Sequence, residues 1–150
     1  MILKTRYPSR FSVVMQHFKN QVRDSLPHAA KDYPAGSIAD AWQLWDELRP
    51  RVTYVNDPSG LELFQSYQTL FYNNWHGKPG AGDCDCFTLS TAAVATVNGL
   101  PFQIVLAGRS KTAPVHIYTE VDGIIIDLTR QKPNDARHYP IIQKFDLWKP

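Results

Sequence analysis

The stretch GDCDCFTLSTAAVATVNG, residues 82–99, predicts a buried helix that starts with a cysteine. Its alanines, and the apolar side chains that repeat at helical spacing, are typical of such a helix. Gly99, followed closely by Pro101, is typical of the position just beyond a helix C-terminus. Cys84 is therefore expected at or near the start of the helix, directly after a glycine-rich loop.

Cys84 is placed as a nucleophilic thiol should be. A helix N-terminus presents free amide hydrogens and a partial positive charge, which lower the pKa of a thiol and can stabilise an oxyanion. Gly82 allows backbone and substrate to approach closely. Asp83 and Asp85 favour the helix start, although they oppose a thiolate electrostatically. Cys86 is expected to point away from Cys84, toward packing.

The two cysteines do not suggest a structural crosslink or a metal centre. Cys84 and Cys86 are one residue apart, and a disulfide between them would close a tiny, strained loop. Two thiols also fall short of a structural zinc set, and His116 and Asp127 add no recognised ligand spacing. What remains is a reactive thiol or two inert buried ones, and neither a metal nor a cofactor is expected.

A hairpin in the last third of the chain brings an imidazole and a carboxylate together. Asp122 and Gly123, between two β-rich runs, predict a two-residue turn. That turn sets Asp127 opposite Tyr118, and His116 lies two residues before Tyr118 on the same face. His116 and Asp127 would then be diagonal neighbours about 7 Å apart at Cα, which long side chains can bridge. A one-residue slip would put them on opposite faces.

The hydrophobic pattern outlines the other elements, which place helices first and an antiparallel sheet last. The order predicts the α+β fold class. The expected elements are an amphipathic helix over 8–24, a loop over 27–36, a helix over 37–49, a strand over 51–55, a turn over 56–60, a helix over 61–72, a loop over 73–82, and strands over 102–107, 114–121, 124–129 and 139–145, the last at a sheet edge.

The second of these helices carries a capping signal. Ser37 and Asp40 match the capping-box pattern at its start. Arg49 and Pro50 close it. We expect core packing from its apolar face, which consists of Ile38, Ala41, Trp42, Trp45 and Leu48.

Length and composition indicate one domain over residues 1–150, with a helical part over about 1–50 and a core over about 51–150. The chain is 43% hydrophobic, which argues against disorder. A net charge of +2 is too small to demand a nucleic acid partner. No signal peptide or membrane-spanning apolar run is evident, so synthesis in the cytoplasm without membrane insertion is expected.

Residues 82–85, the alanine-rich helix and residues 99–101 resemble the transglutaminase-like superfamily of papain-fold cysteine enzymes. His116 before a β-run, and the Asp-Leu-Thr sequence at 127–129, match the later motifs of that family in order and spacing. The lead-in over 52–62 is similar to that of small phage or prophage members. The resemblance implies a papain-like fold, with Cys84 as nucleophile, His116 as base and acid, and Asp127 as the orienting carboxylate.

The chain departs from the family pattern at one place near the nucleophile. Cys86 stands where relatives often carry a second aspartate, but this leaves the triad intact. For the oxyanion, the amide of Cys84 is one candidate donor. Trp75 is the second, by analogy with upstream donors in the superfamily.

These features predict a cysteine peptidase or amidase that works through a thioester acyl-enzyme. Its substrate would be a peptide or protein, and the phage-like lead-in indicates either host cell-wall peptide (peptidoglycan) or a virion protein, in the host cytoplasm or the virion. An amine acceptor in place of water would make it a transglutaminase-type cross-linker, and the residues do not choose between the two. A rival hypothesis from another class is a non-catalytic structural virion or binding module that reuses the fold.

Overall fold

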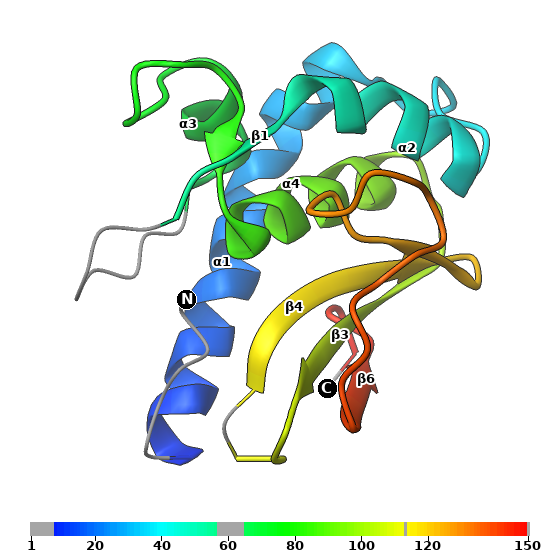
Figure 1. Ribbon diagram of the computed structural model, residues 1–150. Helices are drawn as coiled ribbons and strands as arrows, with labels where there is room; N and C mark the ends of the chain where they lie inside the picture. The colour runs from blue at the N-terminus through cyan, green and yellow to red at the C-terminus, as the bar shows by residue number, and fades with distance from the viewer. Residues whose placement is uncertain (1–7, 57–64, 113, 150) are drawn as a thin grey trace.

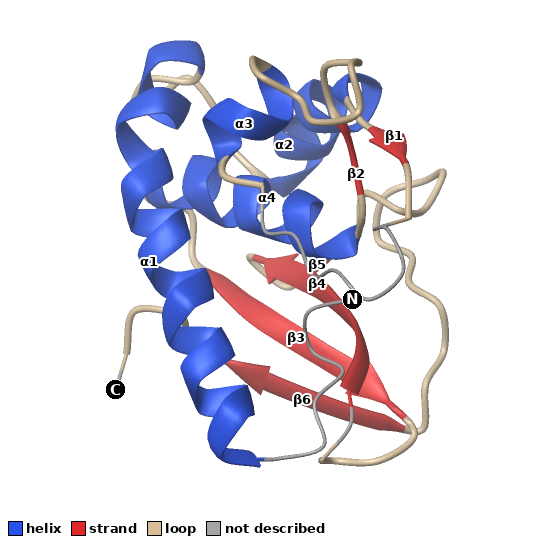
Figure 2. Ribbon diagram, turned by 90° about the vertical axis from the view of Figure 1, so that its left-hand side faces the viewer, coloured by secondary structure: helices blue, strands red, loops and turns tan. Residues whose placement is uncertain are grey.

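The computed structural model describes residues 8–56, 65–112 and 114–149, with side chains from residue 14 onward. The helices gather on one side of a four-stranded antiparallel sheet, and they precede it along the chain (Figures 1 and 2), so the predicted α+β class is confirmed. The elements are α1 (Pro8–Asp32), α2 (Ala41–Leu48), the 3-10 helix η1 (Arg49–Arg51), β1 (Thr53–Tyr54), α3 (Tyr67–Phe71), β2 (Ala81–Gly82), α4 (Cys84–Val97), β3 (Phe102–Gly108), β4 (Pro114–Val121), β5 (Ile124–Ile126) and β6 (Ile141–Phe145).

Helix α4 is the centre of the fold. It packs against α1, α2, α3, β3 and β4, and all of its residues from Cys84 to Ala95 are buried. Small side chains along the helix let neighbours approach it closely on every side, as dense interiors require. Asp83 caps the helix, because its side chain accepts a hydrogen bond from the Asp85 amide at 3.1 Å. The helix predicted within residues 82–99 is confirmed, with Cys84 as its first residue.

The sheet contains the predicted hairpin in the predicted register. Strands β4 and β5 are antiparallel, with Thr119 opposite Ile126. Asp122 and Gly123 form the turn, with φ values of 49° and 80°, the left-handed values that a two-residue turn of this type needs. The strand order is β5-β4-β3-β6, so β6 is an edge strand as predicted.

Helix α1 runs further than expected. The loop predicted over residues 27–36 is wrong at its start, because α1 passes through Pro27 and ends at Asp32. Proline inside a helix removes one hydrogen bond and strains the preceding turn. Tertiary packing offsets this cost: Ala29 is fully buried, and the buried Ser25 hydroxyl accepts a hydrogen bond from the α3 backbone at 3.0 Å. The tertiary contacts of α1 therefore outweigh the tendency of Pro27 to end the helix.

The N-cap of helix α2 lies three residues later than predicted, since Asp40 and not Ser37 caps the helix. Asp40 accepts a hydrogen bond from the Gln43 amide at 2.9 Å, and the Gln43 side chain accepts one from the Ala39 amide at 2.8 Å. Trp42 is 47% exposed, so its predicted place on the apolar face is wrong. The residues of this region that are buried are Ile38, Ala41, Leu44, Trp45 and Leu48.

A short parallel pair, β1 with β2, carries the chain to the start of α4. The predicted strand is present but reduced to two residues, and β2 lies inside the loop predicted over 73–82. Gly80 precedes it at a φ of +82°, and a Cβ there would stand 1.7 Å from the carbonyl oxygen of Arg51. Only glycine therefore permits this approach. The pairing sets Tyr54 beside Gly82, next to the first turn of α4.

The segment between β1 and α3 is only partly described. Residues 57–64 lie outside the described ranges, and with them most of the turn predicted over 56–60 and the start of the helix predicted over 61–72. The described part of that helix is α3, whose N-cap is Ser66. Among the described residues, no helix is both long and apolar enough to span a bilayer.

Candidate active site

The first turn of α4 is joined to strand β4. Cys84 begins the helix and is 2% exposed. One turn later, the Thr88 hydroxyl donates a hydrogen bond to the Ile117 carbonyl oxygen at 3.1 Å. Because His116 immediately precedes Ile117, this contact holds the start of α4 close to the part of β4 that carries the imidazole.

His116 and Asp127 are in direct contact. The His116 Nε2 lies 2.7 Å from the Asp127 Oδ2, and both residues are buried. The other carboxylate oxygen accepts two hydrogen bonds from Thr129, one from its amide at 3.1 Å and one from its hydroxyl at 2.6 Å. Strand β5 ends at Ile126, before the predicted end at residue 129, so Asp127 stands in the turn that follows. The predicted meeting of the two side chains is present.

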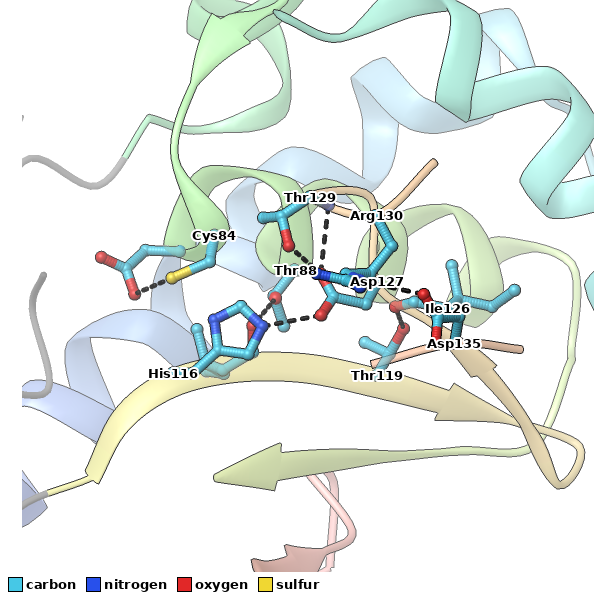
Figure 3. A network of polar contacts seen from close by, with 11 residues as sticks. Cys84, Thr88, His116, Thr119, Ile126, Asp127, Thr129, Arg130 and Asp135 are labelled. Carbon is cyan, nitrogen blue, oxygen red and sulfur yellow. Dashed lines mark hydrogen bonds and ion pairs between the residues drawn. The ribbon is translucent and has the colours of Figure 1, made fainter. Parts of the chain in front are cut away.

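The contact with Asp127 indicates which ring nitrogen of His116 carries the proton. The carboxylate of Asp127 can only accept, so the Nε2 of His116 is its donor. The Nδ1 is then the nitrogen available to another group, and Figure 3 shows that the ring lies between Asp127 and the sulfur of Cys84. The rings of Tyr118 and Tyr139 lie 5.6 and 6.1 Å from the imidazole centroid and restrict its tilt.

Cys84 and His116 open onto the same cavity, of about 320 Å³. In the described part of the chain, no hydrogen bond joins the two side chains, and the Cys84 Sγ lies 3.8 Å from an Asp85 carboxylate oxygen. The other residues that line the cavity are Tyr54, Val115, Thr129, Arg130, Arg137 and Tyr139.

The Cys84 thiol differs from the expectation for a helix start. Its pKa lies well above the ordinary value, chiefly because burial disfavours the thiolate, and next because the charges of Asp85 and Asp83 oppose it. The hydrogen bond from the Ile117 backbone lowers the pKa, but it does not outweigh the other causes. The prediction of a lowered pKa is therefore wrong, and at neutral pH the resting group is a protonated thiol.

Cys86 and Gly82 face the interior. The Cys86 thiol donates to an Asp83 carboxylate oxygen and accepts from the Gln65 side chain, both at 3.6 Å. Burial raises its pKa to about 12. A Cβ at Gly82 would lie 3.0 Å from both the Cys86 Cβ and the Gln65 Nε2. The glycine thus permits close packing of the backbone against these side chains, as expected, and its part in the approach of a substrate stays a prediction.

The two predicted oxyanion donors have different surroundings. Within the described residues, no acceptor binds the backbone N–H of Cys84, so the amide at the start of α4 is available to an oxyanion beside the sulfur. Trp75 is 59% exposed and is not among the residues that line the cavity. Tyr54 does line it, and its hydroxyl donates to the Asn56 side chain at 2.8 Å.

Sequence reasoning missed most of the cavity wall. Arg137 and Tyr139 come from a segment that carries no motif, and Tyr54 lies in the 52–62 lead-in, where the sequence assigns it no role in the site. Only the tertiary structure brings these three side chains to Cys84. Thr129 lies within the Asp-Leu-Thr sequence, and its spacing from Asp127 is the usual one for a hydroxyl that caps a carboxylate. In the described ranges, no group of three or more His, Cys, Asp or Glu side chains is arranged to hold a metal ion.

Comparisons with known proteins are sparse. No family model matches the chain. No curated protein matches it either. Among solved structures, it is similar to a protein from Cytophaga hutchinsonii described as a putative cysteine protease, with a TM-score of 0.47 and 18% identity. The match covers 83% of this chain and 46% of that one, so the chain spans about half the length of this neighbour.

Proposed function

We propose that the chain is a thiol hydrolase that cleaves amide or peptide bonds. More specifically, we propose a small phage-type member of the transglutaminase-like, papain-fold superfamily, with Cys84 as nucleophile, His116 as general base and acid, and Asp127 as the orienting carboxylate. One observation carries the proposal. The imidazole of His116 is held through Nε2 by Asp127 at 2.7 Å while it lines one cavity with the Cys84 thiol.

The first half of the reaction follows from the protonation of the groups. The Cys84 thiol is protonated at rest, so the Nδ1 of His116 must remove its proton as the sulfur attacks the carbonyl carbon. The C–S bond forms and the carbonyl π electrons move to oxygen, which the Cys84 amide can bind. The tetrahedral intermediate then expels the amine, which takes the proton from the imidazolium. A thioester remains on Cys84.

The second half restores the enzyme. His116 takes a proton from water as the water oxygen attacks the thioester carbonyl. The C–S bond breaks, the carboxylic acid product leaves, and the sulfur recovers its proton from the imidazolium. Asp127 keeps the ring oriented and stabilises the imidazolium in both halves. Thr129 fixes the carboxylate, since its amide and hydroxyl both bind the oxygen that His116 does not use.

The test measures product mass with purified protein. Peptidoglycan fragments and a digest of virion proteins are incubated with the wild type, with Cys84→Ala and with Cys86→Ala. We expect peptides with new carboxyl and amino ends from the wild type and Cys86→Ala, and none from Cys84→Ala. A thioester adduct on an acid-quenched sample supports the covalent route.

Other outcomes would replace the proposal. Products joined through a new amide bond, in the presence of an amine donor, would make the chain a transglutaminase-type cross-linker. No Cys84-dependent product on either substrate class, with equally slow alkylation of both thiols, would favour a non-catalytic virion or binding module.

A further inference from the structure

The cavity that holds Cys84 and His116 carries positive charge. Among the described residues, its lining includes two arginines, Arg130 and Arg137, and no aspartate or glutamate. Arg130 is neutralised, because its guanidinium lies 3.0 Å from a carboxylate oxygen of Asp135. Within the described part of the chain no carboxylate pairs with Arg137. Arg137 therefore presents an uncompensated cation to whatever enters the cavity.

The cation is held at a defined place relative to the imidazole. The Arg137 guanidinium carbon lies 5.7 Å from the ring centroid of Tyr139, and that ring lies 6.1 Å from the centroid of His116. A guanidinium over an aromatic face keeps its donors free at the rim while the ring limits its movement. The charge is thus at most about 12 Å from the imidazole, a length that an extended peptide spans in about three residues.

The other side chains of the cavity wall indicate which kind of anion Arg137 could bind. Beside the one guanidinium that has no carboxylate partner among the described residues, the wall offers tyrosines, a threonine and a valine. A phosphate chain or a nucleic acid would need several cations, which this wall does not supply. A guanidinium matches one carboxylate in a bidentate fork. An anion that takes part in the proposed reaction would belong to the same molecule as the amide that the thiol attacks.

We propose that Arg137 binds a carboxylate of the substrate, so that the enzyme prefers peptides with an acidic side chain or a free C-terminal carboxylate within about three residues of the cleaved amide. This rests on the proposed hydrolase function. Arg137 is exposed, so solvent screens the ion pair and its contribution is modest. The contact is made equally in ground state and transition state, and therefore it acts on KM and leaves kcat nearly unchanged.

The experiment uses four pools of acetylated hexapeptides that are degenerate at five positions. The remaining position is Glu or the isosteric Gln, and each pool has a free or an amidated C-terminus. The wild type, Arg137→Gln, Arg137→Lys and Arg109→Gln are compared, Arg109 being an exposed arginine outside the cavity lining. Peptides that the wild type cleaves are then resynthesised as acid and amide pairs for separate measurement of KM and kcat.

Arg137→Gln should raise KM about 3- to 10-fold for the acidic member of each pair and less than about 2-fold for its neutral partner. Arg137→Lys should restore part of the preference, and Arg109→Gln should leave it intact. Equal KM for acidic and neutral peptides with the wild type would overturn the inference, as would a loss that Arg137→Gln causes in kcat alone.

Binding separates this inference from the function on which it rests. Fluorescein-labelled members of the same pools are titrated against Cys84→Ala, with and without Arg137→Gln. Acid preference in binding without turnover by the wild type would overturn the hydrolase and retain the role of Arg137. Turnover without acid preference would overturn the role of Arg137 alone, and the absence of both would overturn both.

Discussion

The first turn of α4 carries two thiols that face different surroundings. Cys84 faces a cavity that is also lined by the imidazole of His116. Cys86 faces the interior, between the side chains of Asp83 and Gln65. Burial raises the pKa of both thiols. Access to the cavity and a neighbouring base, and not acidity, therefore distinguish the candidate nucleophile from a structural cysteine two positions further along the chain.

Removing each thiol in turn should give the largest contrast. Cys84→Ala should lower kcat/KM by about 10⁴-fold or more, because the acyl-enzyme cannot form. Cys86→Ala should keep most of the activity and lower the free energy of unfolding by about 1 kcal/mol, since it leaves a small void. Peptide cleavage and urea unfolding measure the two quantities. Equal losses of activity in both variants would contradict the assignment of roles.

Loss of the orienting carboxylate should remove catalysis while leaving the thiol on the cavity side reactive. Asp127→Asn should lower kcat/KM by about 10³-fold, because the imidazole loses its tautomer and the partner of its imidazolium. Alkylation of Cys84 by iodoacetamide needs a thiolate and no oriented base, so its rate should change less than about 3-fold. A parallel fall in both rates would instead indicate that Asp127 serves mainly to keep the site folded.

The acidic residue beside Cys84 should affect the two thiols unequally. The charge of Asp85 is the second cause of the raised pKa of Cys84, but the last of those acting on the pKa of Cys86. Asp85→Asn should lower the pKa of Cys84, so that a larger fraction of this thiol is thiolate at pH 8. Its alkylation at that pH should become about 3- to 10-fold faster. Mass spectrometry of single-cysteine variants measures both rates, and a larger gain at Cys86 would refute this account.

The buried thiol of Cys86 should make the free energy of unfolding depend on pH in the alkaline range. The pKa of Cys86 is about 12 in the folded chain, against an ordinary value of 9.0, so the folded state keeps its proton while the unfolded chain releases it. The unfolded state then binds fewer protons, and the free energy of unfolding falls between about pH 9 and 12, by at most about 1.4 kcal/mol per pH unit for this thiol. Cys86→Ala should have a shallower decline in urea unfolding between pH 9 and 10.5. Identical slopes would show that the thiol is solvated when folded.

Local chemistry explains what could be predicted. The contact between His116 and Asp127 follows from a turn at Asp122 and Gly123 that fixes which residues oppose each other a few positions away. The position of Cys84 follows from a cap and a helix within one stretch. Where a local signal competed with packing, as at Pro27, packing decided the outcome.

The amino-acid sequence alone determined the residue types of the candidate site, the hairpin register and the helix that begins at Cys84, because turns and caps act over a few neighbouring residues. The inward orientation of Cys86 is also predicted from its place on that helix, and it is confirmed. Only the tertiary structure decided that the Cys84 thiol is protonated and that Arg137 and Tyr139 reach the cavity. Burial and electrostatic potential are sums over atoms from distant segments, and such sums exist only once the chain has folded.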